Sequence, residues 1–117
     1  MAFELLSKNY KSVEATLAAD KSAGDYFVQG NLRGFVIVDV DYSEQPQTTV
    51  IFEAELVKCV KAAGEAWVAG TSLYWSGTAV TTTASTYDLI GFVAKAAASA
   101  DVIGYMVFDG RAEVLVT

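Results

Sequence analysis

Short stretches of alternating apolar and polar residues run along this chain, and small or polar turn residues separate them at intervals of about 8–12 positions. The stretches are rich in Val, Ile, Thr, Tyr and Phe, which favour extended backbone. Short strands at this spacing are typical of a β-sandwich or a small β-barrel. The pattern therefore predicts an all-β fold, a single small barrel or sandwich with at most short helical turns.

In the first half, the stretch from Phe35 to Asp41 predicts a half-buried strand with an acidic end. Its two faces would be Val36, Val38 and Val40 against Ile37, Asp39 and Asp41. A loop is expected from Tyr42 to Thr48, where turn-forming residues gather. The next run, Thr49 to Lys61, changes its apolar phase partway along, which predicts a bulge or a strand break near Leu56.

Three further strands are expected in the second half of the chain. They are Thr71 to Trp75, Val80 to Thr83 across the Ser76-Gly77 turn, and Leu89 to Lys95. Gly91, inside the last of these strands, indicates a bend or a close approach of two backbones. At most a short turn of helix is expected around Ala63 to Val68, because Gly64 weakens a helix there. The stretch from Ala96 to Ala100 is too short for an independent helix and predicts a connection.

The dipeptide Asp109-Gly110 predicts a two-residue hairpin turn of type I′, in which both central residues have positive φ. Counting outward from that turn brings apolar residues together on one face. The expected pairs are Val107 with Ala112, Tyr105 with Val114 and Ile103 with Val116. Because side chains alternate strictly along a strand, this pairing would fix the register of the hairpin.

The length of 117 residues fits one compact domain, taken here as residues 1–117, and 53% apolar content indicates a chain that folds. A net charge of −6 without a basic run argues against nucleic acid as a partner. Charged residues or glycines interrupt every apolar run, so no membrane-spanning helix is predicted. No export signal is visible at the start of the chain.

The residues that carry most enzyme chemistry are few. The sequence has no histidine, no phosphate-binding glycine loop, no calcium-loop spacing and no nucleophile elbow. Its one cysteine, Cys59, lies among apolar residues and predicts a buried thiol. Two carboxylates share a strand face at Glu53 and Glu55, as do Asp39 and Asp41, and such pairs are usually solvated. No catalytic, metal or cofactor site is therefore assigned, and a small carboxylate enzyme using Glu53 and Glu55 remains an alternative.

Aromatic and apolar residues offer candidate contact surfaces instead. The interface candidates are Phe3, Leu5, Leu6, Trp67, Tyr74 and Trp75. Tyr74 and Trp75 are consecutive, so on a strand they point to opposite faces and at least one should be less buried. Residues 1–10 are either an arm that adds a strand to a neighbouring protein, or an ordinary part of the domain, that is, a frayed terminus or its first strand. A carbohydrate- or ligand-binding β-module that uses Trp67, Tyr74 or Trp75 is a further alternative.

From Gly64 onward the chain reads GEAWVAGTSLYWSGTAVTTTASTYDLIGFVAKAAASADVIGYMVFDG, and this order of motifs resembles the capsid cement, or decoration, proteins of tailed phages. The matching elements are Gly-Glu-Ala at 64–66, Gly70, Tyr74-Trp75, Val80 to Thr83, Leu89-Ile90-Gly91, an Ala-rich connection that ends at Asp101, and a final hairpin. The chain departs from the family pattern at Thr71, where Asp is common, and between Asp39 and Thr49, which is longer and more polar than usual.

The resemblance implies a compact β-barrel-like domain on the outer surface of an icosahedral phage head. It implies the major capsid protein as the partner and a homo-oligomer, a trimer, that clamps neighbouring capsid subunits. Such a protein needs complementary surface and no cofactor. Another virion component, from the head-tail connection or the tail, remains an alternative within the structural class.

Overall fold

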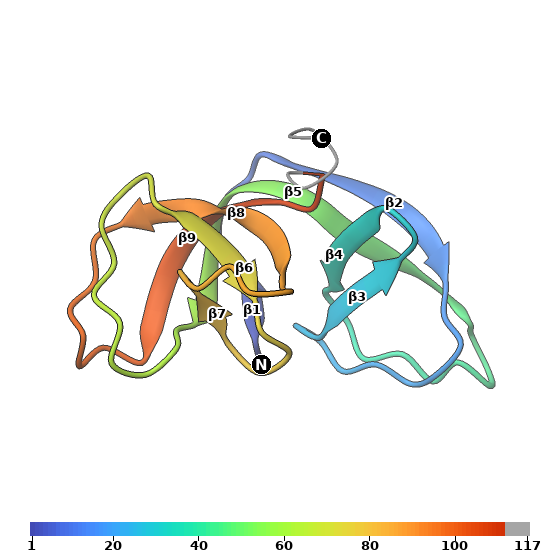
Figure 1. Ribbon diagram of the computed structural model, residues 1–117. Coiled ribbons are helices and arrows are strands. Elements are labelled where there is room, and N and C mark those ends of the chain that lie inside the picture. The colour runs from blue at the N-terminus through green and yellow to red at the C-terminus, as the bar shows by residue number, and fades with distance from the viewer. Residues whose placement is uncertain (112–117) are drawn as a thin grey trace.

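The computed structural model describes residues 1–111, and within them the chain forms nine strands and no helix (Figure 1). The strands are β1 (Phe3–Leu5), β2 (Tyr10–Thr16), β3 (Tyr26–Gln29), β4 (Leu32–Val36), β5 (Gln47–Val60), β6 (Ser72–Trp75), β7 (Val80–Thr81), β8 (Asp88–Lys95) and β9 (Ile103–Asp109). All of the strand pairs are antiparallel. The predicted all-β class is confirmed. No helix in this part of the chain has the length and apolar character to cross a membrane.

The long strand β5 organises the sheet. Its neighbours on the main path give the order β3-β4-β5-β9-β8-β6-β7, and β1 and β2 also pair with β5. Figure 1 shows β5 running across the top of the molecule, from a lobe of β2, β3 and β4 to a lobe that contains β6, β7, β8 and β9. A strand of 14 residues can serve both lobes because its two ends pair with different partners.

The predicted bulge near Leu56 is confirmed. The register between β5 and β9 shifts between Ala54 and Val57, at the position where the apolar phase of the sequence changes. On the far side of the bulge, Val57 and Cys59 point into the core, as Ile51 does before it. A bulge bends the strand and increases its twist, so it helps the sheet to curl around its interior.

Two clusters of buried side chains fill the interior. The larger lies in and around the β6–β9 lobe, with Phe3, Phe35, Ile51, Ala54, Val57, Cys59, Trp67, Leu73, Val80, Ile90, Val93, Met106 and Phe108. The smaller lies between β2, β4 and β5 and contains Ala15, Leu17, Phe27, Val36, Val40 and Val50. Since β5 contributes to both clusters, the two lobes form one folded unit around it.

The β6–β7 hairpin and β8 follow the sequence prediction. β6 pairs with β7 across Ser76-Gly77, and β8 carries Gly91 inside it. Gly91 has a φ of +149°, and a Cβ atom there would lie 2.0 Å from the carbonyl oxygen of Val107. The close backbone approach that the glycine indicated is therefore present between β8 and β9. Residues 96–100 form a connection without helix, also as predicted.

The predicted hairpin at Asp109-Gly110 is wrong in the described part of the chain. Neither residue has a positive φ, and β9 pairs with β5 on one edge and β8 on the other. Gly110 instead packs against the carbonyl oxygen of Arg33, where a Cβ atom would lie at 1.7 Å, and its N–H donates to Phe52 O at 2.6 Å. The predicted partners in 112–117 lie outside the described residues.

The face of β9 that was expected to be apolar is also the wrong one. The structure buries Gly104, Met106 and Phe108, whereas Ile103 is exposed and Tyr105 and Val107 are only half-buried. Both faces of β9 carry apolar residues, so alternation alone did not show which one faces the core. The small Gly104 is needed on the inner face because a Cβ atom there would lie 2.2 Å from the Trp67 ring.

Two further expectations need correction. The strand predicted from Phe35 to Asp41 ends at Val36, because the chain bends at Ile37 and Val38. Val36 and Val40 are buried, but Val38 is 53% exposed and does not share their face. No turn of helix forms over 63–68, where Trp67 makes an isolated antiparallel bridge with Ala97.

Cys59 is buried, as predicted, with its Sγ donating to the carbonyl oxygen of Gly104 at 3.6 Å. Burial raises the pKa of the Cys59 thiol to about 12. Because the thiolate is the reactive species, we expect Cys59 in the folded protein not to react with a disulfide reagent at about pH 8. Addition of denaturant should release one thiol per chain, which an absorbance assay measures. Rapid reaction of the folded protein would contradict the buried position.

Candidate functional site

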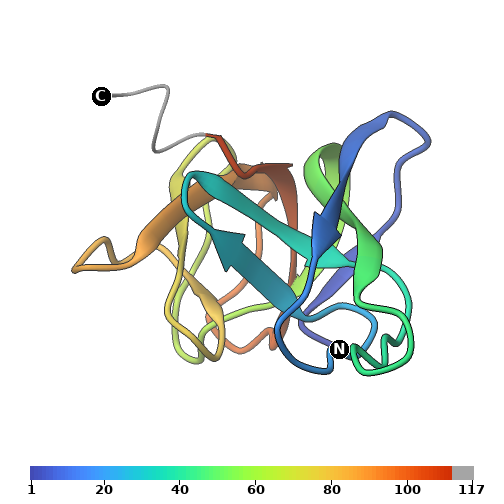
Figure 2. The same cartoon turned by 90° about the vertical axis from the view of Figure 1, so that its right-hand side faces the viewer.

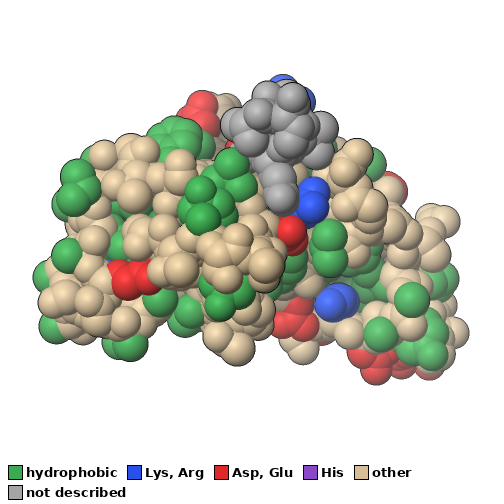
Figure 3. All heavy atoms as spheres, in the orientation of Figure 1, with side chains coloured by type: hydrophobic (Ala, Val, Ile, Leu, Met, Phe, Trp, Pro, Cys, Tyr) green, Lys and Arg blue, Asp and Glu red, His purple; other side chains and the backbone are tan. Residues whose placement is uncertain are grey.

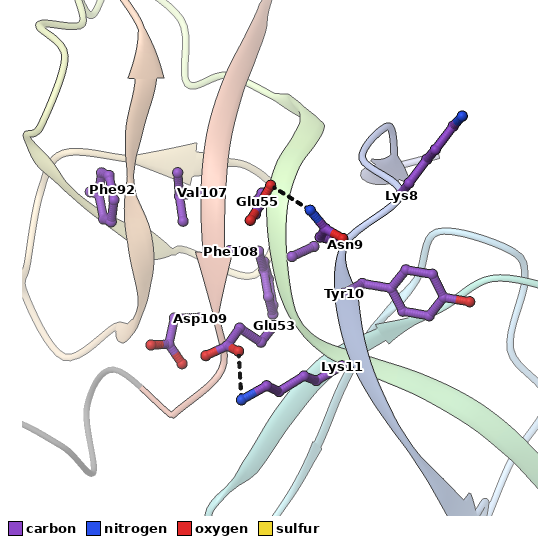
Figure 4. Close-up of a pocket in the computed structure, with 11 residues that line it drawn as sticks. Lys8, Asn9, Tyr10, Lys11, Glu53, Glu55, Phe92, Val107, Phe108 and Asp109 are labelled. Carbon is purple, nitrogen blue, oxygen red and sulfur yellow. Dashed lines mark hydrogen bonds and ion pairs between the residues drawn. The ribbon is translucent and has the colours of Figure 1, made fainter.

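A groove of about 410 Å³ lies on the outside of the sheet, where β2, β5, β8 and β9 run side by side. Its walls are Lys8, Asn9, Tyr10, Lys11, Glu53, Ala54, Glu55, Phe92, Val107, Phe108 and Asp109. Figure 4 shows Glu53 and Glu55 between the residues of β2 on one side and Phe92, Val107 and Asp109 on the other. The strand register explains this meeting, since Lys11 and Asp109 are both cross-strand partners of Glu53.

The carboxylates of this groove form ion pairs and hydrogen bonds. Glu53 lies 3.4 Å from Lys11 Nζ, and Glu55 accepts a hydrogen bond from Asn9 Nδ2 at 3.2 Å (Figure 4). The other carboxylate oxygen of Glu53 lies 2.5 Å from Arg111 Nη2. Burial acts to raise the pKa of Glu53, but hydrogen bonds and charge from Arg111 and Lys11 outweigh it and hold the pKa below its usual value. A general acid requires the opposite shift. Glu53 and Glu55, the two carboxylates of the enzyme alternative, are thus engaged in an ion pair and a hydrogen bond on the surface.

The interface candidate Phe3 lies at the centre of the core. Its ring stacks on Phe35 at 5.4 Å between centroids and packs against Trp75 at 5.1 Å and Phe108 at 5.5 Å. Phe3 is 1% exposed, and β1 pairs with β5 of the same chain. Of the two expectations for residues 1–10, the structure therefore has the first strand of the domain. Phe3 offers no surface to a partner in this fold.

Trp75 closes the open side of the core from β6. Its ring lies 5.4 Å from Tyr26, whose hydroxyl donates to Asp88 Oδ2 at 2.7 Å. Arg33 Nε lies 3.2 Å from the same Asp88 oxygen. These contacts hold the β3–β4 hairpin against β6 and β8. Trp75 and Tyr74 are both half-buried, so neither is a fully exposed aromatic platform.

Trp67 is buried in a polar cage that fixes the loop before β6. Its Nε1 donates to Glu65 at 3.2 Å, and Glu65 also accepts from the Thr82 N–H at 3.0 Å and from the Thr81 hydroxyl. On the other side, the ammonium of the buried Lys61 lies 6.0 Å from the Trp67 ring and donates to two carbonyl oxygens. With 1% exposure, Trp67 is a core residue that cannot stack on a sugar in this fold.

The hydrogen bonds that Glu65 accepts make the stability of the fold depend on pH. Burial acts to raise the pKa of Glu65, but hydrogen bonds from Thr81, Thr82 and Trp67 outweigh it and lower the pKa. A lowered folded-state pKa contributes stability above the ordinary glutamate value, and this contribution is lost as pH falls through the folded value. We expect Glu65→Gln to cost about 1 kcal/mol near pH 7 and progressively less on acidification.

Urea unfolding of the wild type and the variant over a range of pH values checks the Glu65 prediction. The exposed Glu44, whose carboxylate accepts no hydrogen bond from a described residue, provides the control Glu44→Gln, which should change stability little at any pH. A cost of Glu65→Gln that stayed constant down to the acid end of the series would contradict the proposed origin.

The remaining interface candidates do not form one surface with the others. Leu5 is half-buried against the core, and Leu6 is 42% exposed at the end of β1. In the described part of the chain, no three Asp, Glu, His or Cys side chains are arranged to hold a metal ion. The predicted set thus contains core residues and scattered partly exposed ones, and its role in binding stays a prediction.

The pattern of the sequence did not predict β2, the most exposed strand of the described residues. Only Ala15 among its seven residues is buried, so the strand shows little of the apolar alternation that marks β-structure. The separate β3–β4 hairpin was not predicted either. The signal there is Gly30-Asn31 between two apolar runs, a dipeptide suited to a tight hairpin, and Gly30 has a φ of +59°.

The described residues form a small all-β domain whose outer groove is lined by carboxylates in ion pairs and hydrogen bonds. Comparison with protein families finds a match to the phage cement proteins over residues 7–108. The chain belongs to the phage cement protein family. The match includes all strands from β2 to β8 and all but the last residue of β9. No curated protein and no solved structure matched the chain.

Proposed function

We propose that this protein is a cement subunit that binds the outer surface of an icosahedral phage head and stabilises it through contacts with the major capsid protein. The observation that carries the proposal is the family match over residues 7–108. The structure is consistent with a protein that acts through contacts, since a curled sheet with two packed cores presents a rigid surface. In this proposal the protein acts by contact alone and not as an enzyme. Many weak contacts repeated over a shell add up to a large stabilisation.

The proposal is tested with heads that lack the protein. Purified protein should bind these heads saturably in a co-sedimentation assay and raise the temperature at which they release DNA. Isolated tails, included as a separate sample, test the alternative of a head-tail or tail component. Saturable binding to tails with none to heads would replace the proposal by that alternative, and binding to neither would refute both.

We further propose that the protein acts as a homo-oligomer, with a trimer as the expected state. Sedimentation equilibrium should then give three times the chain mass of 12.5 kDa. If the measured mass stayed at that of one chain over the protein concentrations at which heads become coated, the trimer would be refuted. The proposal of capsid binding would not be affected, because the co-sedimentation assay tests it separately.

A further inference from the structure

The outer edge of β2 is a long open strand edge in the described part of the chain. β2 pairs with β5 alone, and no described backbone group bonds to its other edge. Six of its seven residues are exposed, Tyr10 by 49% and Val13 by 40%, and only Ala15 is buried, in the smaller core cluster. Figures 1 and 2 show β2, in blue, along the outside of the molecule next to β5.

The register shows which backbone groups point outward. The N–H of Leu17 donates to Pro46 O at 2.7 Å, one position beyond the pair Thr16↔Gln47. Antiparallel pairs alternate between hydrogen-bonded and non-bonded. Counting back in twos from Leu17, the backbones of Ala15 and Val13 face β5. The N–H and C=O groups of Ser12, Glu14 and Thr16 therefore point away from the sheet.

Most of the features that discourage strand addition lie at one end of this edge. At the start of β2, a further strand would be hindered by the register shift between Lys11 and Ser12 and by the charged Lys11 side chain. From Ser12 to Thr16 the strand has no lysine, no proline and no bulge, and its one charged residue is Glu14. This half of the edge is a regular template for a further strand.

Charge favours a basic occupant. Residues 10–50, which contain β2 to β4 and their loops, have three basic residues and six acidic ones: Glu14, Asp20, Asp25, Asp39, Asp41 and Glu44. Figure 3 shows acidic side chains gathered at the lower right, on the lobe of β2, β3 and β4. On β2 itself, Glu14 accepts one hydrogen bond, from Thr49 Oγ1 at 2.7 Å to Oε1.

We propose that the outer edge of β2 binds an extended segment of the capsid subunit, which joins the sheet as a strand beside Ser12–Thr16. Backbone hydrogen bonds to Ser12, Glu14 and Thr16 supply the attachment, and side chains set the specificity. The segment that fits carries an apolar residue beside Val13 and a basic residue beside Glu14. This inference rests on the proposed function and names the surface that performs it.

Amide hydrogen exchange tests the proposal directly. In the free protein the amides of Val13, Ala15 and Leu17 should exchange slowly, and those of Ser12, Glu14 and Thr16 fast. On protein bound to heads, the second set should become protected. Head-bound protein whose Ser12, Glu14 and Thr16 amides still exchange fast would overturn the inference and leave the proposed function standing. Protection that rises with protein concentration in the absence of heads would also overturn it, because the occupant would then be a second copy.

Two variants of Glu14 distinguish the contribution of its backbone hydrogen bond to head binding from the contribution of its side-chain charge. Glu14→Pro removes an outward N–H that bonds nothing in the free protein, so the variant should fold and bind heads at least about tenfold more weakly. Glu14→Gln keeps the N–H and removes only the charge, so it should weaken head binding by about two- to fivefold, less than the proline variant does. Equal head binding by the proline variant and the wild type would refute strand addition. If Glu14→Pro does not fold, the exchange experiment on the wild type decides, and absence of any binding to heads refutes the inference together with the proposed function.

Discussion

Replacing Phe3 with alanine should lower the free energy of unfolding by about 3–5 kcal/mol. The Phe3 ring is 1% exposed and touches four other aromatic rings, those of Tyr26, Phe35, Trp75 and Phe108. Its removal leaves a cavity between β1 and the four strands that carry these rings, β3, β4, β6 and β9, and rings held on four strands cannot all move in to fill it. Urea unfolding followed by tryptophan fluorescence measures the change.

The control for Phe3 is Leu6→Ala, three residues along and 42% exposed. This variant should lose less than about 1 kcal/mol, because the Leu6 side chain is already partly exposed to water. If Phe3→Ala and Leu6→Ala both lost little stability but both bound heads more weakly, the position of Phe3 in the core would be contradicted. Such a result would favour the alternative that residues 1–10 are an arm that adds a strand to a neighbouring protein. The comparison therefore distinguishes the two predictions made for residues 1–10.

Gly91→Ala should destabilise the fold by about 2–5 kcal/mol. Two costs combine at this position. A φ of +149° is strained for a residue with a side chain, and the new methyl group would lie 2.0 Å from Val107 O, so β8 and β9 would have to separate. Thermal unfolding of the variant measures the sum of these costs.

Gly77 provides the matched control for Gly91. It also has a positive φ, of +102°, but a Cβ atom there would meet nothing within 4 Å. Gly77→Ala should therefore lose stability through backbone strain alone, by about 1–2 kcal/mol. If the two alanine variants unfolded at the same temperature, the close approach between β8 and β9 would not be the reason for the glycine.

The local features of the sequence predicted much of the strand structure. The phase change in Thr49 to Lys61 located the bulge of β5, and Gly91 marked the contact between two backbones. Apolar neighbours predicted that Cys59 is buried. Each of these features depends on residues close together in the chain or on a requirement of a single residue, so the pattern of the chain expresses it directly.

The candidate site was harder to predict because it depends on contacts between distant segments. Glu53, Lys11 and Arg111 meet only through the pairing of β2, β5 and β9 and the chain that follows β9. The aromatic residues chosen from the sequence as contact surface include Trp67 and Phe3, which the fold buries. An aromatic residue has the same character in a core and at an interface, so its type alone does not assign its place.

The sequence by itself determined the all-β class, the family and the positions of the strands from β5 to β8. Only the tertiary structure decided which face of β9 is buried, that β1 belongs to its own sheet, and that β2 keeps an open edge. The physical reason is that alternation defines two faces of a strand without saying which one meets the core. Likewise, whether an edge is paired depends on where distant strands lie, which the residues of that edge do not encode.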